Sequence, residues 1–190
     1  MYRAREQADI LRDLQERSDT PASKIEGTFE YDVLASNSIE FGKVEVELEE
    51  AYRQSFGTTA TDEYLTMKAA ESGVFRKKAV KAHGILTVTG SGLIRKGSLF
   101  ATEGGIRFVS IVDSVIAFSG KIEIEAVDAG AFGNVPDRTI TKIPFSIPGI
   151  SAVTNEAAMQ DGYDEEEDEA LRARYLEHVR YPGASGNKRH

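Results

Sequence analysis

The longest stretch of helical hydrophobic spacing lies near the start of the chain and predicts an amphipathic helix over about residues 28–55. Within it, Leu34, Phe41 and Leu48 are seven residues apart, and Val44 falls at the intermediate spacing of three or four. Residues with this spacing share one face of a helix. The sequence therefore predicts an apolar seam that packs against another helix, either within the chain or in another copy.

Two shorter helices are predicted on either side of this long helix, which completes a helical region over residues 1–80. One covers residues 5–17, and the other starts near Thr61 and ends near Gly73. The long helix carries further apolar residues on other faces: Val33, Ile39, Val46, Tyr52 and Phe56. Since the helix over residues 5–17 is too short to cover all of them, we expect either the following β region or another chain to do so.

The hydrophobic period changes to alternation over residues 81–160. In the segment KIEIEAV, isoleucine and glutamate alternate, which is typical of a strand with one buried face. Most of the 17 glycines of the chain lie in this region, and tight turns between strands need them. Pro144 and Pro148 indicate an edge strand or an extended arm around them. We therefore predict a small antiparallel β domain, sandwich-like or barrel-like.

A helical pattern returns over residues 161–190. The acids of Asp164–Glu169 are expected in the first turns of this helix, and arginines follow in its later turns, which complements the helix dipole. The turn at residues 181–183 stops the helix, and the chain ends at His190, so we expect the truncated beginning of a further C-terminal region there. The resulting fold class is α+β, with an N-terminal helical region, a central small antiparallel β domain and a C-terminal helix.

The distribution of charge and the apolar runs exclude several classes of partner. The chain has 31 acidic and 23 basic residues, and residues 161–169 alone hold seven acids and no base, which leaves 24 acids against 23 bases elsewhere. The basic cluster at residues 76–81 has no interleaved aromatic residues, so we predict a solvated linker and no nucleic-acid partner. No apolar run approaches the ~20 residues that span a bilayer, so we predict no membrane insertion.

No pattern of reactive residues points to catalysis. The chain has no cysteine, and its three histidines, His83, His178 and His190, show no metal-binding spacing. The glycine-rich segment 89–97 lacks the spacing of phosphate-binding loops, and the acidic run lacks the ligand spacing of a calcium loop. We therefore predict a protein that is not an enzyme, with no catalytic residues, no metal, no cofactor and no small-molecule substrate.

Three segments resemble the baseplate J-like family of contractile phage tails and prophage-derived tail-like particles. They are FATEGGIRF (100–108), GNVPDRTITKIPFSIPGISAVTN (133–155) and DEEEDEALRARYLEHVRYPGASGN (164–187), and the helical segment 62–84 precedes them in the same order. Residues 1–60 match only in their amphipathic helical character. Family members continue beyond the equivalent of the last segment, so the resemblance implies an N-terminal fragment.

The resemblance implies a structural role in the baseplate wedge, which surrounds the central hub and tube. Its implied partners are other wedge and hub proteins and other copies of itself, and its implied location is the tail baseplate of a virion or tail-like particle assembled in the bacterial cytoplasm. The resemblance to this family implies no catalytic residues. The expected contact residues are those of the seam: Leu34, Phe41, Val44 and Leu48.

Two alternatives belong to other functional classes. A tail-associated adhesin or carbohydrate-binding β-module with a helical stalk would need exposed aromatic residues on the β region. That region offers no Trp or Tyr, and its phenylalanines are Phe100, Phe108, Phe118, Phe132 and Phe145. A hydrolase of peptidoglycan would need a metal site or paired acids, which the sequence patterns do not indicate.

Overall fold

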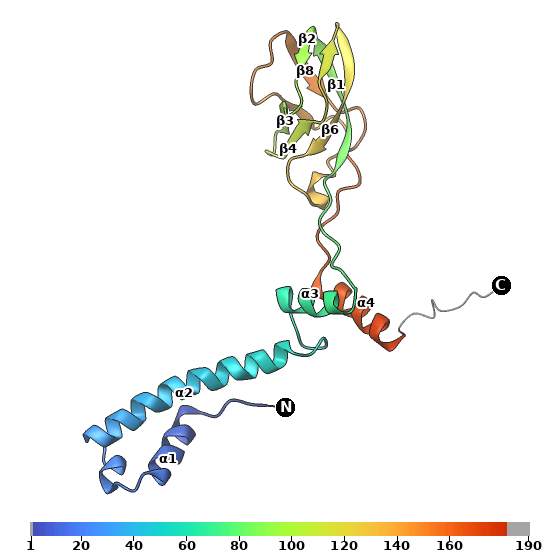
Figure 1. Ribbon diagram of the computed structural model, residues 1–190. Helices are drawn as coiled ribbons and strands as arrows, with labels where there is room; N and C mark the ends of the chain where they lie inside the picture. Colours follow the sequence, from blue (N-terminus) through green and yellow to red (C-terminus); the bar gives the residue numbers. More distant parts are fainter. Residues whose placement is uncertain (1, 182–190) are drawn as a thin grey trace, which may run out of the picture. The chain divides into compact units, whose positions relative to one another are not determined.

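The computed structural model describes residues 2–181 and divides the chain into two compact units (Figure 1). The helical unit contains the residues up to Phe75 and those from Asp168 onward, and the β unit contains Arg76–Glu167. The C-terminal helix therefore belongs with the N-terminal helices, which lie far from it in the sequence. The prediction of three separate domains, with boundaries after residues 80 and 160, stays a prediction.

The helices of the helical unit lie where the hydrophobic spacing predicts them. They are α1 (Gln7–Arg17), the 3-10 turn η1 (Pro21–Lys24), α2 (Phe29–Gln54), α3 (Asp62–Glu71) and α4 (Asp168–Arg180). Thr28 starts α2 because its hydroxyl accepts a hydrogen bond from the backbone N–H of Tyr31 at 3.3 Å. Among the described residues, no helix is both long and apolar enough to cross a membrane.

Helices α3 and α4 share a small core of their own. Leu65 and Ala69 of α3 are buried against Leu171 and Tyr175 of α4. The side chain of Asp168 accepts a hydrogen bond from the N–H of Asp62 at 2.7 Å, at the start of α3. Arg172 of α4 donates two hydrogen bonds of 3.0 Å to the carbonyl of Ala60. These contacts tie the two ends of the helical unit together.

The expectation that Asp164–Glu169 form the first turns of the last helix is wrong, because α4 begins at Asp168. The backbone before it pairs instead with the segment that enters the β unit. Val80 and Tyr163 exchange two backbone hydrogen bonds, of 2.8 and 3.1 Å, and Glu166 N–H donates to the carbonyl of Lys77. These bonds hold the backbone extended, so only Asp168 and Glu169 occupy the first turn. Of the predicted stop at residues 181–183, Tyr181 follows α4, and residues 182–190 lie outside the described part.

The β unit is an antiparallel sheet that curls into a nearly closed barrel. Its strands are β1 (His83–Gly90), β2 (Gly92–Ile94), β3 (Leu99–Thr102), β4 (Arg107–Ser110), β5 (Ser114–Ile116), β6 (Ser119–Ala126), β7 (Ile140–Lys142) and β8 (Ile150–Thr154). Six of them pair in the order β7-β3-β4-β6-β1-β8, while β2 and β5 form a separate two-stranded ribbon. The edge strands β7 and β8 contact one another. The predicted fold class is confirmed, with the barrel-like form of the β domain.

The barrel core follows the alternation of the strands. In β6, Ile122 and Ile124 are buried while Glu123 is exposed, as the KIEIEAV pattern indicates. Phe100 of β3 and Phe108 of β4 lie directly opposite each other and are fully buried. Pro144 and Pro148 fall in the connection between the two edge strands, where no ladder hydrogen bond needs their missing N–H.

One fully buried asparagine closes the gap between the edge strands. The Asn155 side-chain oxygen accepts hydrogen bonds from the N–H groups of Thr139 and Ile140, each at 3.0 Å. Its amide nitrogen donates to the carbonyls of Pro136, at 2.7 Å, and Ala157, at 2.9 Å. The side chain thus uses both donors and both acceptor positions. It supplies the hydrogen bonds that a ladder between β7 and β8 would otherwise provide.

We expect Asn155→Ala to destabilise the β unit by about 2–4 kcal/mol, because it removes the acceptor of the buried Ile140 N–H and of the partly buried Thr139 N–H, and the side-chain donor to the Ala157 carbonyl. Hydrogen exchange measured by mass spectrometry should show faster exchange of the Thr139 and Ile140 amides, which Asn155 holds. Asn37→Ala, at an exposed asparagine of α2, is the matched control. Unchanged protection at residues 139–140 in Asn155→Ala would contradict this account of barrel closure.

Candidate functional site

The strongest candidate for a functional surface is the hairpin formed by α1 and α2. Helix α1 packs on a face of α2 that carries small residues: Ala35, Ser38 and Gly42. Ser38 is fully buried, and Ile10 of α1, also buried, lies above Gly42, where an added Cβ would be 3.9 Å from the isoleucine methyl group. Small residues let the two helices approach closely. The larger apolar residues of α2 therefore lie beside α1 and not beneath it.

The segment before α1 is held on α2 by two glutamates. Glu49 accepts a hydrogen bond from the N–H of Ala4 at 2.8 Å. Glu45 accepts from the N–H of Arg5 at 2.9 Å and from its guanidinium, which also pairs with Asp13 of α1 at 2.8 Å. The hydrogen bonds from the Arg5 side chain, and then from its backbone, lower the pKa of Glu45 below its usual range. The same partners, Glu45 first, raise the pKa of Arg5.

The predicted seam residues line an open groove along one side of α1. Phe41, Val44 and Leu48 are 53%, 58% and 52% exposed. Together with Ile10 and Leu14 of α1 they form the apolar lining of a groove of about 410 Å³. Leu34 is partly buried and is not among the lining residues of this groove. The structure thus brings three of the four predicted residues together beside α1.

A second groove lies beside α1 and has a different lining. Ile39 and Val46 of α2, both about half exposed, line it together with Gly42. Hydrophobic spacing alone marks Ile39 and Val46 as further apolar residues of the helix and does not show that α1 separates them from the seam. The signal that could have shown it is the spacing of Ala35, Ser38 and Gly42, which marks a face of small residues at helical period.

The hairpin is strongly acidic. Residues 7–54 contain 12 acidic and five basic residues, an excess of seven acids. Residues 161–169 carry the same excess, and without them the charges of the chain are nearly balanced. The remainder is balanced only because the residues outside these two segments carry 18 bases against 12 acids. The hairpin as a whole therefore carries negative charge, whereas each of the two grooves is lined by two acidic and two basic side chains.

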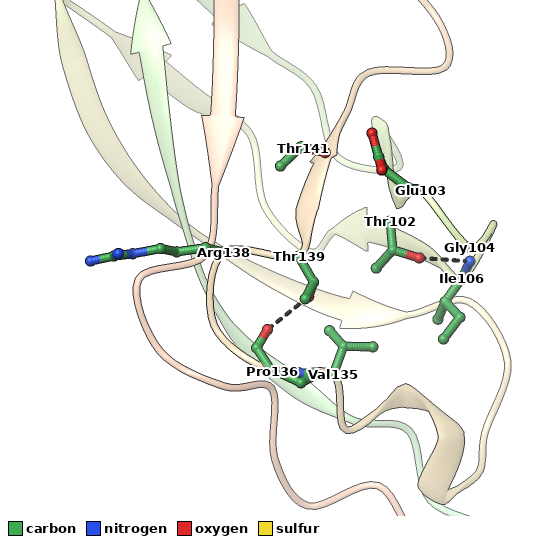
Figure 2. Close-up of a pocket in the computed structure, with 9 residues that line it drawn as sticks. All are labelled: Thr102, Glu103, Gly104, Ile106, Val135, Pro136, Arg138, Thr139 and Thr141. Carbon is green, nitrogen blue, oxygen red and sulfur yellow. Dashed lines mark hydrogen bonds between the residues drawn. The ribbon is translucent and has the colours of Figure 1, made fainter.

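A hollow on the β unit offers little chemistry (Figure 2). Its lining includes two charged side chains, Glu103 and Arg138, and Arg138 extends away from the other residues drawn. The hydroxyl of Thr102 accepts from the N–H of Ile106 at 3.1 Å, and that of Thr139 donates to the carbonyl of Pro136 at 2.7 Å. These hydroxyl groups stabilise the loops, and no acid–base pair converges on the hollow.

The titratable residues named in the sequence analysis do not converge either. Within residues 2–181, no group of three or more His, Asp or Glu side chains is placed to hold a metal ion. His83 lies 3.5 Å from the carboxylate of Asp161, and both side chains are more than half exposed. His178 lies in the last turn of α4, and His190 lies outside the described residues.

The aromatic residues of the β unit divide between core and surface. Phe100 and Phe108 are fully buried in the barrel. Phe118, Phe132, Phe145 and Tyr163 are exposed, and Tyr163 belongs to the β unit although it lies beyond the predicted boundary at residue 160. Phe118 follows β5 and has a positive φ of 69°, and its N–H donates to the hydroxyl of Ser91.

Residues 85–162 match the Baseplate J-like protein barrel domain. The chain is 30% identical over 165 residues to the phage-like element PBSX protein XkdT of Bacillus subtilis. This alignment covers 87% of this chain and 45% of the relative. It is 30% identical over 145 residues to baseplate protein gp47 of Escherichia phage Mu. This alignment covers 72% of this chain and 39% of the relative. The chain thus spans less than half the length of these relatives. In the solved baseplate of the anti-feeding prophage, one chain aligns over 92% of this chain and 52% of its own length, with a TM-score of 0.47 and 10% identity.

We expect acid to loosen the start of α1 from α2. Since the pKa of Glu45 is lowered in the folded chain, its bond to Arg5 stabilises the fold above the ordinary glutamate pKa of about 4.3 and is lost as the pH falls through the lowered value. The protection of the Arg5 amide, measured as its exchange rate relative to that of the unfolded chain at the same pH, should decrease below about pH 4. Glu45→Gln should show fast exchange already at neutral pH, whereas Glu47→Gln is the matched control. Equal protection of Arg5 in both variants would contradict the role of Glu45.

Proposed function

This chain belongs to the Baseplate J-like proteins through its barrel domain, and we propose that it is a structural component of the baseplate wedge of a contractile phage tail, prophage tail or tail-like particle. In this role it helps to link wedges around the central hub and tube through protein–protein contacts. Its place is the tail baseplate, and assembly takes place in the cytoplasm of the bacterial host. Because the chain spans under half of its relatives, further contacts of a longer protein lie beyond this proposal.

The observation that carries the proposal is the exposed seam of α2 in a chain with a baseplate barrel domain. Phe41, Val44 and Leu48 are each more than half exposed on a single helix face. Monomeric proteins seldom expose contiguous apolar surface of this kind, and such surface marks contact sites. We propose that the seam, with Leu34 at its start, contacts other wedge or hub proteins or further copies of this chain.

A structural role also accounts for the chemistry of the surface. The hollow of the β unit holds no converging acid–base pair, and the matched family and the Mu relative carry the word baseplate in their names. A non-enzymatic function is the simplest one that agrees with both observations. The protein contributes a shape and a set of apolar contacts to an assembly.

We expect Phe41→Asp to leave the fold intact but to weaken assembly. Because Phe41 is half exposed, the free energy of unfolding should change by no more than about 0.5–1 kcal/mol, as measured by chemical denaturation. Co-purification of the proteins encoded by neighbouring tail genes should fall by about tenfold or more, since a buried charge at an interface costs several kcal/mol.

Ser36→Asp is the matched control, because it adds the same charge at an exposed polar position of α2. It should preserve co-purification. Loss of folding in Phe41→Asp would show instead that the seam is internal core. Recovery of tail proteins equal to wild type would show that the contact surface lies elsewhere.

A further inference from the structure

We infer that Phe118, at the end of the β2–β5 ribbon, is an anchor residue that inserts into an uncharged apolar pocket of a different protein. The inference rests on the proposed function, under which that protein is another baseplate component, and it adds a contact surface on the β unit. It follows from three features of this end of the ribbon: the strained backbone of Phe118, the exposed apolar face beside it and the lack of charge.

The first feature is a strained turn that presents the ring of Phe118. The N–H of Ser119 donates to the carbonyl of Ala117 at 2.9 Å, and Phe118 between them has a φ of 69°. This is the rarer kind of γ-turn, in which a side chain on the central residue is strained. The turn is fixed on both sides. The N–H of Gly90 donates to the Phe118 carbonyl at 2.9 Å, and the Phe118 N–H donates to the Ser91 hydroxyl at 3.1 Å.

The ring itself contributes little to the core of the β unit. Phe118 is 86% exposed, so its strain is not explained by apolar burial. A glycine would adopt the same φ without strain. Strained backbone of this kind concentrates at functional sites, and a side chain that is already fixed loses less conformational entropy when it binds. The turn therefore holds the ring ready for insertion into a partner.

The second feature is the exposed apolar face of the ribbon that leads to Phe118. Leu93 of β2 and Val115 of β5 lie directly opposite each other and are 46% and 82% exposed. The residues next to them, Ile94 and Ile116, are buried in the barrel core. Since successive residues of a strand point to opposite faces, the ribbon cannot bury both pairs at once. Leu93 and Val115 are therefore left for another molecule to cover.

The third feature is the lack of charge around these side chains. Segments 89–94 and 111–120 together contain one charged residue, Asp113. Its carboxylate accepts a hydrogen bond from the N–H of Lys96 at 2.6 Å, at the end of the ribbon away from Phe118. The centre of a protein interface is depleted of charge, and its anchors are often aromatic side chains in desolvated pockets. The surface thus matches an uncharged apolar pocket.

A different protein fits this surface better than a second copy of the chain. Two copies that met through it would cover only Leu93, Val115 and Phe118 on each side, whereas a stable interface holds roughly 20–30 residues a side. The hollow of the β unit is not a suitable receptor, because three threonines and two charged side chains, Glu103 and Arg138, contribute to its lining. Phe118 therefore serves as an anchor within a larger contact with another folded protein.

Photochemical cross-linking identifies the receptor of the ring. Benzoyl-phenylalanine is placed at position 118, and the chain is co-expressed with the neighbouring tail genes. Irradiation should link position 118 to one other tail protein, at residues that mass spectrometry assigns to an apolar pocket. Asp128 is the control position, because it is exposed and follows the opposite end of β6. The probe at position 128 should not link to the same pocket.

Replacement of Phe118 by glycine separates anchoring from folding. Phe118→Gly should raise the Tm of the β unit by a few degrees in differential scanning calorimetry, because the relief of strain exceeds the entropy that glycine loses on folding. Recovery of the cross-linked protein by co-purification should fall at least about tenfold, as for an aromatic hot spot. Phe132→Gly is the matched control. Phe132 is 51% exposed without a positive φ, so this change should lower the Tm and preserve recovery.

Three results would overturn the inference. They are linkage of position 118 to a second copy or to no other protein, a Tm of Phe118→Gly that stays equal or falls, and equal recovery of the linked protein by this variant and the wild type. None of these would remove the co-purification that depends on Phe41, which tests the proposed function. Linkage to an apolar pocket of a protein outside the tail would count against the proposed function alone.

Discussion

The arrangement of the helical unit depends on a mismatch in length between two packed helices. Helix α1 has 11 residues and α2 has 26, which correspond to about 17 and 39 Å along their axes. A short helix seated on the small residues around Gly42 cannot cover the apolar side chains on either side. The large residues of α2 are therefore placed at the surface by geometry, even though their spacing is that of a packed core. A surface of this kind suits a part of a larger assembly.

The β unit buries its apolar core side chains within its own strands and loops. Its strands bury a continuous core, and the opening between β7 and β8 is closed by the amide of Asn155. A buried amide with all hydrogen-bonding positions filled also fixes one loop geometry, since any other leaves polar groups unpaired. The chain thus combines a self-contained barrel with a helical unit whose apolar grooves are open. Under the proposed function, the barrel is the self-contained module and the grooves of the helical unit are the contact surface.

The sequence predicted the features that depend on local period, and it missed those that depend on distant neighbours. The bounds of α2 and the alternation in β6 follow from hydrophobic spacing, and both agree with the structure. The acids before Asp168 look like the start of a helix, yet pairing with residues 77–83 holds them extended. The role of Asn155 depends on loop closure, which no local pattern encodes. For the candidate site, spacing identified Phe41, Val44 and Leu48, but the groove beside them arises only when α1 docks.

The order of elements along the chain has a consequence for biosynthesis. Helix α3 ends before the barrel begins, but its packing partners Leu171 and Tyr175 lie beyond the barrel, and the side chain that bonds its first N–H is 106 residues away. All strand pairings of the barrel lie within Arg76–Glu167. As the chain leaves the ribosome from its N-terminus, the barrel has everything that it needs while α3 still lacks its apolar partner. All contacts of the barrel are therefore available before α4 is synthesised, whereas the core shared by α3 and α4 can form only after Leu171 and Tyr175 have left the ribosome.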